Sequence, residues 1–183
     1  LSDNVRRLMA YLDGVLPGYE IVIVSNGSTD ATVEIGEQLA AMYPVITFSH
    51  TDKRGVGYAF RRGISLTEAE KIITVDADLT TDTDFIPRAC ALLDRYDIVI
   101  GSKRRGFQER PAVRIAGSAL YIFSVRTLLR LPFGDYSIGA KAYRREIVIQ
   151  YLDHVMAGSS YVVDMIYRLW YGGGRITEIP VRC

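Results

Sequence analysis

Short, continuous apolar runs alternate with segments of helical periodicity along the first hundred residues. The run Glu20–Ser25 is rich in β-branched residues and too continuous for a half-exposed strand, which predicts a buried central parallel strand. Three similar runs predict strands over 45–48, 71–75 and 97–100, and the segments between them predict helices over 31–42, 55–66 and 85–93. Because strand and helix alternate, we expect a doubly wound α/β fold with a mostly parallel central sheet flanked by helices.

The pattern changes in the second part of the chain. The stretch 113–131 is long, mostly apolar and helical in period, and Pro132 ends it. A strand over 138–143, a helix over 161–171 and a last strand over 175–182 are expected after it. No linker, repeat or low-complexity segment interrupts the 183 residues, so the sequence predicts a single domain.

Composition and charge exclude several classes of protein. The net charge of +1 gives no overall field for nucleic acid, so no nucleic-acid partner is expected. Two cysteines are too few for a disulfide framework or a zinc site, which favours a reducing compartment. No apolar run reaches the roughly 18–20 residues of a membrane span. The chain has no initiator Met and opens directly in a helical pattern (Val5, Leu8, Met9, Leu12), so we expect it to be an excerpt of a longer protein.

Two carboxylates, Asp76 and Asp78, directly follow the apolar run 71–75. Open α/β sheets bind ligands at the carboxyl ends of their strands. Carboxylate oxygens with a substrate phosphate are a suitable ligand set for Mg²⁺ or Mn²⁺. Aspartate also ends strands and caps helices for local reasons, so the spacing alone leaves both interpretations open.

Three loops are expected at the same edge of the sheet. Asn26–Asp30 joins a strand to a helix, whose amino end offers N–H groups to an anion. Lys53–Ala59 is basic, and its glycines permit close backbone approach. Gly101–Arg105 begins a local basic cluster that suits a phosphate, and Arg114 and Ser118 lie one helical turn apart beyond it. Taken singly, each loop is also compatible with an ordinary turn bearing solvated charges.

Taken in order, these segments resemble the family 2 glycosyltransferases with the type A nucleotide-sugar fold, in particular the dolichyl- and polyprenyl-phosphate sugar synthases. The matching segments are 20–30, 55–59, 75–79, 101–104, 135–141 and 178–181. The resemblance implies a nucleotide-sugar-binding half (1–102) and an acceptor-binding half (103–183). The family's first strand, which ends in Pro-x-Tyr-Asn-Glu, is missing, and the family usually has Asp where Ser25 and Asn26 stand.

The resemblance also implies a role for each matched residue. The nucleotide would be bound by Ser25, Asn26, Gly27, Asp30, Arg54, Gly55 and Asp76. Asp76 and Asp78 would be catalytic and would hold the Mg²⁺ or Mn²⁺. An acceptor phosphate would be received by Lys103, Arg104, Arg114 and Ser118, and Asp135 would act on the acceptor side of the catalytic centre.

The implied reaction moves a sugar, with inversion, from a donor of the GDP-mannose or UDP-glucose type to an acceptor, above all a dolichyl or polyprenyl phosphate. A lipid phosphate is already anionic, whereas a glycan hydroxyl needs a carboxylate base, for which Asp135 and Asp164 are both candidates. The apolar tract 121–131 favours a peripheral enzyme at the cytoplasmic face of a membrane. A sugar-phosphate nucleotidyltransferase and a non-catalytic nucleotide-sugar- or lipid-binding domain remain alternatives.

Overall fold

A computed structural model of the protein describes residues 1–103 and 112–182, and of residues 112–116 it describes the backbone alone. The helices are α1 (Ser2–Val15), α2 (Thr32–Met42), α3 (Val56–Ser65), α4 (Phe85–Leu92), α5 (Ala112–Leu128), α6 (Arg145–Tyr151) and α7 (Tyr161–Tyr171), with a 3-10 turn η1 (Leu152–His154). The strands are β1 (Ile21–Asn26), β2 (Ile46–Thr51), β3 (Lys71–Thr74), β4 (Ile98–Ser102), β5 (Lys141–Arg144) and β6 (Ile176–Pro180).

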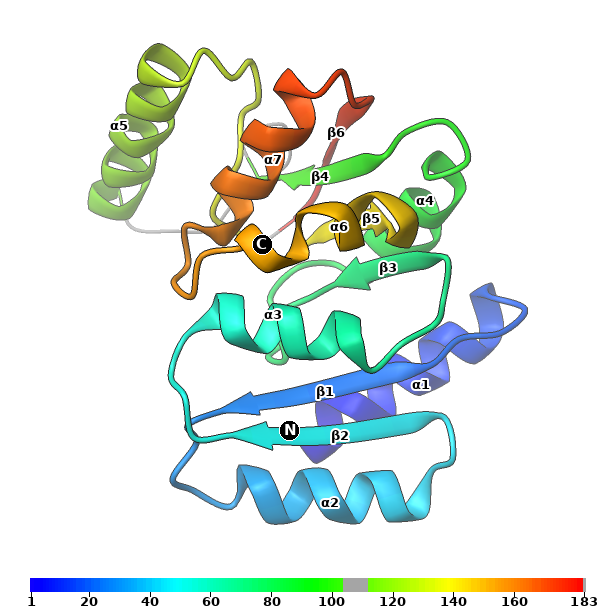
Figure 1. The fold of residues 1–183 in the computed structure, drawn as a ribbon. Helices are drawn as coiled ribbons and strands as arrows, with labels where there is room; N and C mark the ends of the chain where they lie inside the picture. The colour runs from blue at the N-terminus through cyan, green and yellow to red at the C-terminus, as the bar shows by residue number, and fades with distance from the viewer. Residues whose placement is uncertain (104–111, 183) are drawn as a thin grey trace.

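The strands form two hydrogen-bonded groups (Figure 1). β1 and β2 pair in parallel. The other four strands have the order β3-β5-β4-β6, in which β5 runs antiparallel to both β3 and β4, and β6 runs parallel to β4. The α/β class with flanking helices is therefore confirmed, but the second group is mixed, because β5 separates β3 from β4. A strand's apolar pattern fixes which face is buried and not the direction in which the strand runs.

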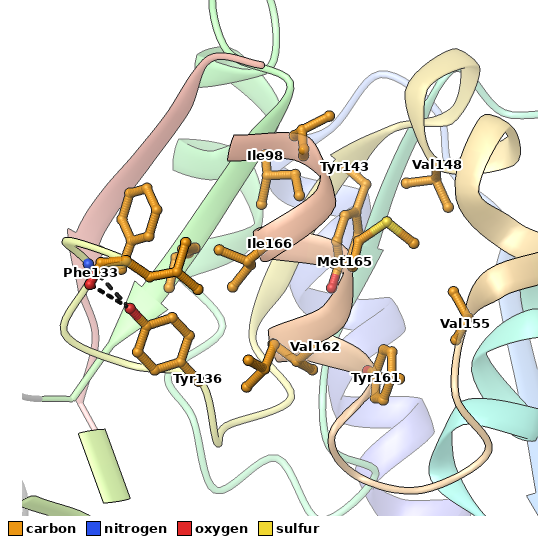
Figure 2. Close-up of a cluster of buried hydrophobic side chains, with 14 of the residues drawn as sticks. Ile98, Phe133, Tyr136, Tyr143, Val148, Val155, Tyr161, Val162, Met165 and Ile166 are labelled. Carbon is orange, nitrogen blue, oxygen red and sulfur yellow. Dashed lines mark hydrogen bonds between the residues drawn. The ribbon is translucent and has the colours of Figure 1, made fainter. Parts of the chain in front are cut away.

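Helices cover both faces of the four-stranded group. Along β4, Ile98 and Ile100 contact a large core cluster on one face, while Val99 faces α4 on the other. The large cluster lies beneath α7, where Val162 and Ile166 pack close to Tyr143 of β5 (Figure 2).

Buried Tyr136 fixes the segment between α5 and β5. Its hydroxyl donates to the Leu131 carbonyl (3.1 Å) and accepts from the Phe133 N–H (3.2 Å), as Figure 2 shows. Burial raises the pKa of Tyr136 to about 12. The predicted helix over 113–131 ends earlier, at Leu128, and the predicted strand over 138–143 begins only at Lys141. α6 and η1 were not predicted. Among the described residues, no helix has the length and apolar character needed to cross a membrane.

β1 and β3 are less buried than their sequences predict. Ile21 to Val24 and all four residues of β3 are half-buried, whereas all five residues of β4 are buried. Within the described ranges, β1 pairs only with β2, and β3 pairs only with β5. Each of the two strands therefore has one edge without a strand partner.

Candidate active site

The predicted site residues lie at the carboxyl ends of the strands. In Figure 1 the arrowheads of β1, β2, β3 and β4 point to the same side of the molecule, and we call this edge the rim. Asn26 ends β1, Asp76 follows β3 and Lys103 follows β4. A cavity of about 640 Å³ is lined by Val24, Asp76 and Gly139, so it extends from β1 to the Asp76 carboxylate at the rim.

The turn after β1 is closed by side-chain contacts. The Ser25 hydroxyl donates to Ser28 Oγ (2.9 Å), and His50 Nδ1 lies 3.1 Å from Ser25 Oγ. Gly27 has φ of +75°, a conformation that favours glycine, and a Cβ there would lie 2.7 Å from Arg54 Cγ. The structure therefore brings Arg54 against the 25–28 turn, as expected for two parts of one nucleotide site.

Asp30 lies just before α2 and is exposed. Its Oδ1 accepts a hydrogen bond from the Thr32 N–H (3.1 Å). The hydrogen bonds to Thr32 hold the pKa of Asp30 below its usual value, because they stabilise the charged form. Asp30 is thus an ionised group beside the predicted nucleoside position.

The glycines of the 53–57 loop allow a close backbone approach, and the backbone that approaches them is that of Met156 and Ala157. A Cβ on Gly55 would lie 2.5 Å from the Ala157 carbonyl oxygen, and one on Gly57 would lie 1.8 Å from the Met156 carbonyl oxygen. The Gly57 N–H donates to the Ala157 carbonyl (2.9 Å). These glycines join α3 to the segment before α7, so the described contacts give them a structural role.

The two predicted metal ligands form a tight turn after β3. Asp76 Oδ2 accepts a hydrogen bond from the Gly139 N–H (3.1 Å), and a Cβ on Gly139 would lie 2.4 Å from Asp76 Oδ1. Asp78 Oδ1 accepts from the Thr80 N–H (3.1 Å). Both carboxylates are exposed. Asn4 at the start of α1 donates to the Ala77 carbonyl between them (3.0 Å).

The pair fits a divalent cation that also binds substrate phosphates. The described part of the chain contains no group of three or more His, Cys, Asp or Glu side chains that could enclose a metal. Each of Asp76 and Asp78 has one oxygen in a hydrogen bond, and a carboxylate has further lone pairs for a cation. Mg²⁺ is commonly held by one or two carboxylates together with phosphate oxygens and water.

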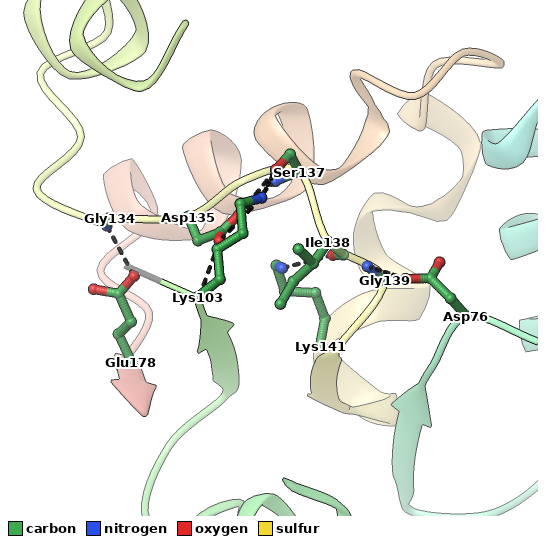
Figure 3. Close-up of polar contacts among 9 residues, drawn as sticks. All are labelled: Asp76, Lys103, Gly134, Asp135, Ser137, Ile138, Gly139, Lys141 and Glu178. Atoms are coloured by element: carbon green, nitrogen blue, oxygen red, sulfur yellow. Dashed lines mark hydrogen bonds and ion pairs between the residues drawn. The ribbon is translucent and has the colours of Figure 1, made fainter. Parts of the chain in front are cut away.

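On the acceptor side, Asp135 and Lys103 form a buried pair (Figure 3). Asp135 is 0% exposed and Lys103 is 2% exposed, and Lys103 Nζ lies 3.4 Å from Asp135 Oδ2. Asp135 also accepts from the backbone N–H groups of Lys103 (3.2 Å) and Ser137 (2.9 Å). The Lys103 ammonium donates to Ser137 Oγ as well. Both predicted residues therefore hold the loop between α5 and β5.

Sequence reasoning missed two further charged residues that contact this loop, Lys141 of β5 and Glu178 of β6. Lys141 is fully buried and its Nζ donates to the Ile138 carbonyl (2.8 Å), while Glu178 Oε1 accepts from the Gly134 N–H (2.9 Å). Burial lowers the pKa of Lys141 to about 8, and Asp135 opposes that shift. A lysine in the apolar run 138–143 was the signal that could have identified the first residue.

Other predicted residues are placed less fully. Arg104 lies outside the described residues, and of Arg114 the structure describes only the backbone, in α5. Ser118 is half-buried on the same helix. Asp164, the alternative base, pairs through Oδ1 with Arg168 Nε (3.0 Å), and its buried Oδ2 has no hydrogen-bond partner among the described residues.

Comparisons with known proteins identify the family to which the chain belongs. The profile of the family described as Glycosyl transferase family 2 matches residues 4–152. Glycosyltransferase AglD of Haloferax volcanii is 30% identical over 192 residues, which cover 99% of this chain and 30% of that protein. Dolichol-phosphate mannosyltransferase of Pyrococcus furiosus is 34% identical over 104 residues, which cover 55% of this chain and 30% of that protein. The chain thus spans less than a third of either relative's length.

A solved structure shares the fold. Glucosyl-3-phosphoglycerate synthase from Mycobacterium tuberculosis, in complex with Mn²⁺, UDP-glucose and phosphoglyceric acid, is similar with a TM-score of 0.68 at 15% identity, over 97% of this chain and 63% of that one. The resemblance drawn from the motifs is confirmed by the match of the family profile to most of the chain and by the 30% identity with AglD over 99% of this chain. This chain therefore belongs to glycosyl transferase family 2.

Proposed function

We propose that this domain transfers a sugar, with inversion, from a nucleoside diphosphate sugar to a dolichyl or polyprenyl phosphate. The observation that supports it most directly is the meeting, at one rim, of the 25–30 turn, the Asp76–Asp78 turn and the loop held by Asp135. The acceptor class follows from the names of relatives such as the dolichol-phosphate mannosyltransferase.

On the donor side, Asn26 and Asp30 would contact the nucleoside, and Ser25, Gly27, Arg54 and Gly55 would shape its pocket. Asp76 and Asp78 would hold Mg²⁺ or Mn²⁺. Such a cation, when bound, neutralises the diphosphate that leaves. Asp76 already accepts the Gly139 N–H, so the donor-side carboxylate is positioned by the loop that belongs to the acceptor side.

On the acceptor side, Lys103, Arg104, Arg114 and Ser118 would receive the lipid phosphate. A phosphate oxygen is anionic without the help of a base, and the cationic groups would position it against the repulsion of the donor diphosphate. Asp135 would fix the direction of Lys103, since it contacts both the ammonium and the backbone N–H of that residue.

A lipid acceptor requires contact with a membrane surface, and α5 offers apolar side chains for it. Leu120, Phe123 and Leu128 are exposed, and Leu128 is 79% exposed. Tyr167, Trp170 and Tyr171 of α7 are also exposed, and the Tyr171 hydroxyl donates to the Leu129 carbonyl just after α5 (3.0 Å). Aromatic and aliphatic side chains beside Arg126 are typical of a helix that lies in the membrane interface. We propose that this surface contacts the cytoplasmic face of a membrane.

The test is a transfer assay on the full-length protein. UDP-glucose and GDP-mannose are each incubated with dolichyl phosphate, undecaprenyl phosphate or a neutral glycan, with and without Mn²⁺. We expect metal-dependent transfer to a lipid phosphate, at least 10²-fold slower in Asp78→Asn. The matched control is Asp94→Asn, an exposed carboxylate that pairs with Lys71 at the first residue of β3, at the opposite end from the rim.

Three outcomes would contradict parts of this proposal. Full activity after removal of metal would remove the role of the cation. Transfer to the glycan alone would replace the lipid phosphate with a hydroxyl acceptor and would require a base such as Asp164. Donor binding without any transfer would favour the non-catalytic alternative.

A further inference from the structure

We propose that Lys141 positions the Asp76 carboxylate indirectly, through the peptide group that joins residues 138 and 139. The proposal rests on the role proposed above for Asp76 as a ligand of the divalent cation. Figure 3 shows the order of the contacts: Lys141 lies on one side of the 138–139 segment, and Asp76 lies on the other side. A buried residue of the acceptor side would thereby set the geometry of the donor side.

One peptide group carries both contacts. Lys141 Nζ donates to the Ile138 carbonyl oxygen (2.8 Å). The N–H of the same peptide group is that of Gly139, and it donates to Asp76 Oδ2 (3.1 Å). A trans peptide group is planar, so its C=O and its N–H point in opposite directions. The ammonium that fixes the direction of the carbonyl therefore also fixes the direction in which the N–H points.

The next peptide group is held from the neighbouring strand. Thr74 ends β3 and pairs with Lys141 in the register of β3 and β5. The Thr74 hydroxyl donates to the Gly139 carbonyl (2.6 Å). A Cβ on Gly139 would lie 2.4 Å from Asp76 Oδ1. Hydrogen bonds thus hold the peptide groups on both sides of the Gly139 Cα, and this backbone lies directly against the carboxylate.

Burial suits Lys141 to positioning and prevents contact with a substrate. Its side chain is 0% exposed. Burial disfavours the ammonium, and the carboxylates of Asp135 and Glu178 favour it. Rotation of the peptide group would take the Ile138 carbonyl away from this buried charge and turn its oxygen toward the Asp76 carboxylate. Both changes are unfavourable, so the observed direction of the N–H is retained without a bound ligand.

The direct test is hydrogen exchange of the Gly139 amide in metal-free protein, measured by NMR. Lys141→Met keeps the length of the side chain and removes the donor. We expect the Gly139 amide to exchange at least about tenfold faster, while Val99 in β4 keeps its protection. The matched control is Lys71→Met, because the Lys71 ammonium also donates to a backbone carbonyl, that of Cys90 (3.0 Å), at the first residue of β3. The control should leave exchange at Gly139 unchanged.

A second measurement concerns the binding of Mn²⁺ in the presence of UDP or GDP, with free Mn²⁺ followed by EPR. Lys141→Met should raise the Kd at least about tenfold, because groups that orient metal ligands typically contribute 10- to 100-fold to affinity. In protein that already carries Asp76→Asn, Lys141→Met should cause no further loss, since it acts through Asp76. The thermal midpoint of Lys141→Met should not fall, because burial disfavours the ammonium that is removed.

Three results would overturn the proposal. The first is unchanged exchange at Gly139 in Lys141→Met. The second is a loss of Mn²⁺ affinity that is equally large in Lys71→Met or that persists in the Asp76→Asn protein. The third is a lower thermal midpoint with faster exchange throughout the chain, which would show a general structural role. Absence of Mn²⁺ binding or of sugar transfer in the unsubstituted protein would contradict the proposed function, whereas exchange at Gly139 still decides whether Lys141 orients the peptide group.

Discussion

The buried pair of Asp135 and Lys103 gives the sharpest test of how the acceptor loop is held. The perturbation is a double-mutant cycle of Asp135→Asn and Lys103→Met, which removes each charge with little change of volume. Asp135 accepts backbone hydrogen bonds at 2.9 and 3.2 Å and lies 3.4 Å from the Lys103 ammonium, and neither side chain is more than 2% exposed. The cycle measures the free energy of unfolding of the four proteins.

The magnitude follows from burial. Breaking a buried ion pair by removing one partner costs about 3–5 kcal/mol, because the other charge remains buried without compensation. The cost of Asp135→Asn should fall in this range, because the substitution removes the carboxylate that stabilises the buried ammonium charges of Lys103 and Lys141. Replacing both charges is much less costly. We therefore expect a coupling free energy of at least about 2 kcal/mol between the two sites.

The chain offers a matched control in Lys71 and Asp94, whose Nζ and Oδ1 lie 2.6 Å apart with 33% and 67% of their side chains exposed. Exposed pairs contribute about 0–1 kcal/mol. Urea unfolding with linear extrapolation measures both couplings. If the buried pair couples no more strongly than the exposed pair, the charges do not hold the loop, and Lys103 is free to act on an acceptor phosphate alone.

Three further predictions concern single positions. Gly139→Ala should displace Asp76, because the new Cβ would lie 2.4 Å from Asp76 Oδ1. We expect kcat/KM to fall about 10²-fold with an unchanged thermal midpoint. Normal activity would show that catalysis does not require the Asp76 carboxylate at this position. The free energy of unfolding should rise by about 2 kcal/mol from pH 8 to pH 10, relative to that of Lys141→Met. Burial lowers the pKa of Lys141 in the folded protein to about 8, whereas in the unfolded chain the pKa is about 10.5, so the unfolded chain binds more protons in this range. Curves of unfolding free energy against pH that run parallel for the two proteins would refute this. Gly57→Ala should lower the free energy of unfolding by more than about 2 kcal/mol, since its Cβ would lie 1.8 Å from the Met156 carbonyl oxygen; a loss below about 0.5 kcal/mol in urea unfolding would contradict the contact.

The sequence predicted which residues lie at the rim, because an apolar run shows where a strand lies and the polar residues that follow it show where the strand ends. An apolar run that ends in Asp76, or in Ser25 and Asn26, identifies a strand and its carboxyl end. In an α/β order those ends meet at one edge. The resemblance then added roles for these residues, and the family is confirmed while the individual roles remain proposals.

The sequence did not predict the features that depend on distant partners. The direction of β5 depends on its pairing with β3 and β4, and nothing within Lys141–Arg144 records that pairing. Burial of Lys141 depends on Asp135, Glu178 and the Ile138 carbonyl, which come from separate positions along the chain. The glycines of the 53–57 loop fit a ligand or a neighbouring backbone equally well, and only the fold shows the carbonyl groups of Met156 and Ala157 beside them.

Asp76 connects these observations, because it lies between the acceptor loop and the space beside β3. On one side it accepts the N–H of Gly139, which belongs to the loop that buried charges hold in place. On the other side it lines the cavity between β1 and β3. Changes in the acceptor loop should therefore alter metal and donor binding through the position of this one carboxylate.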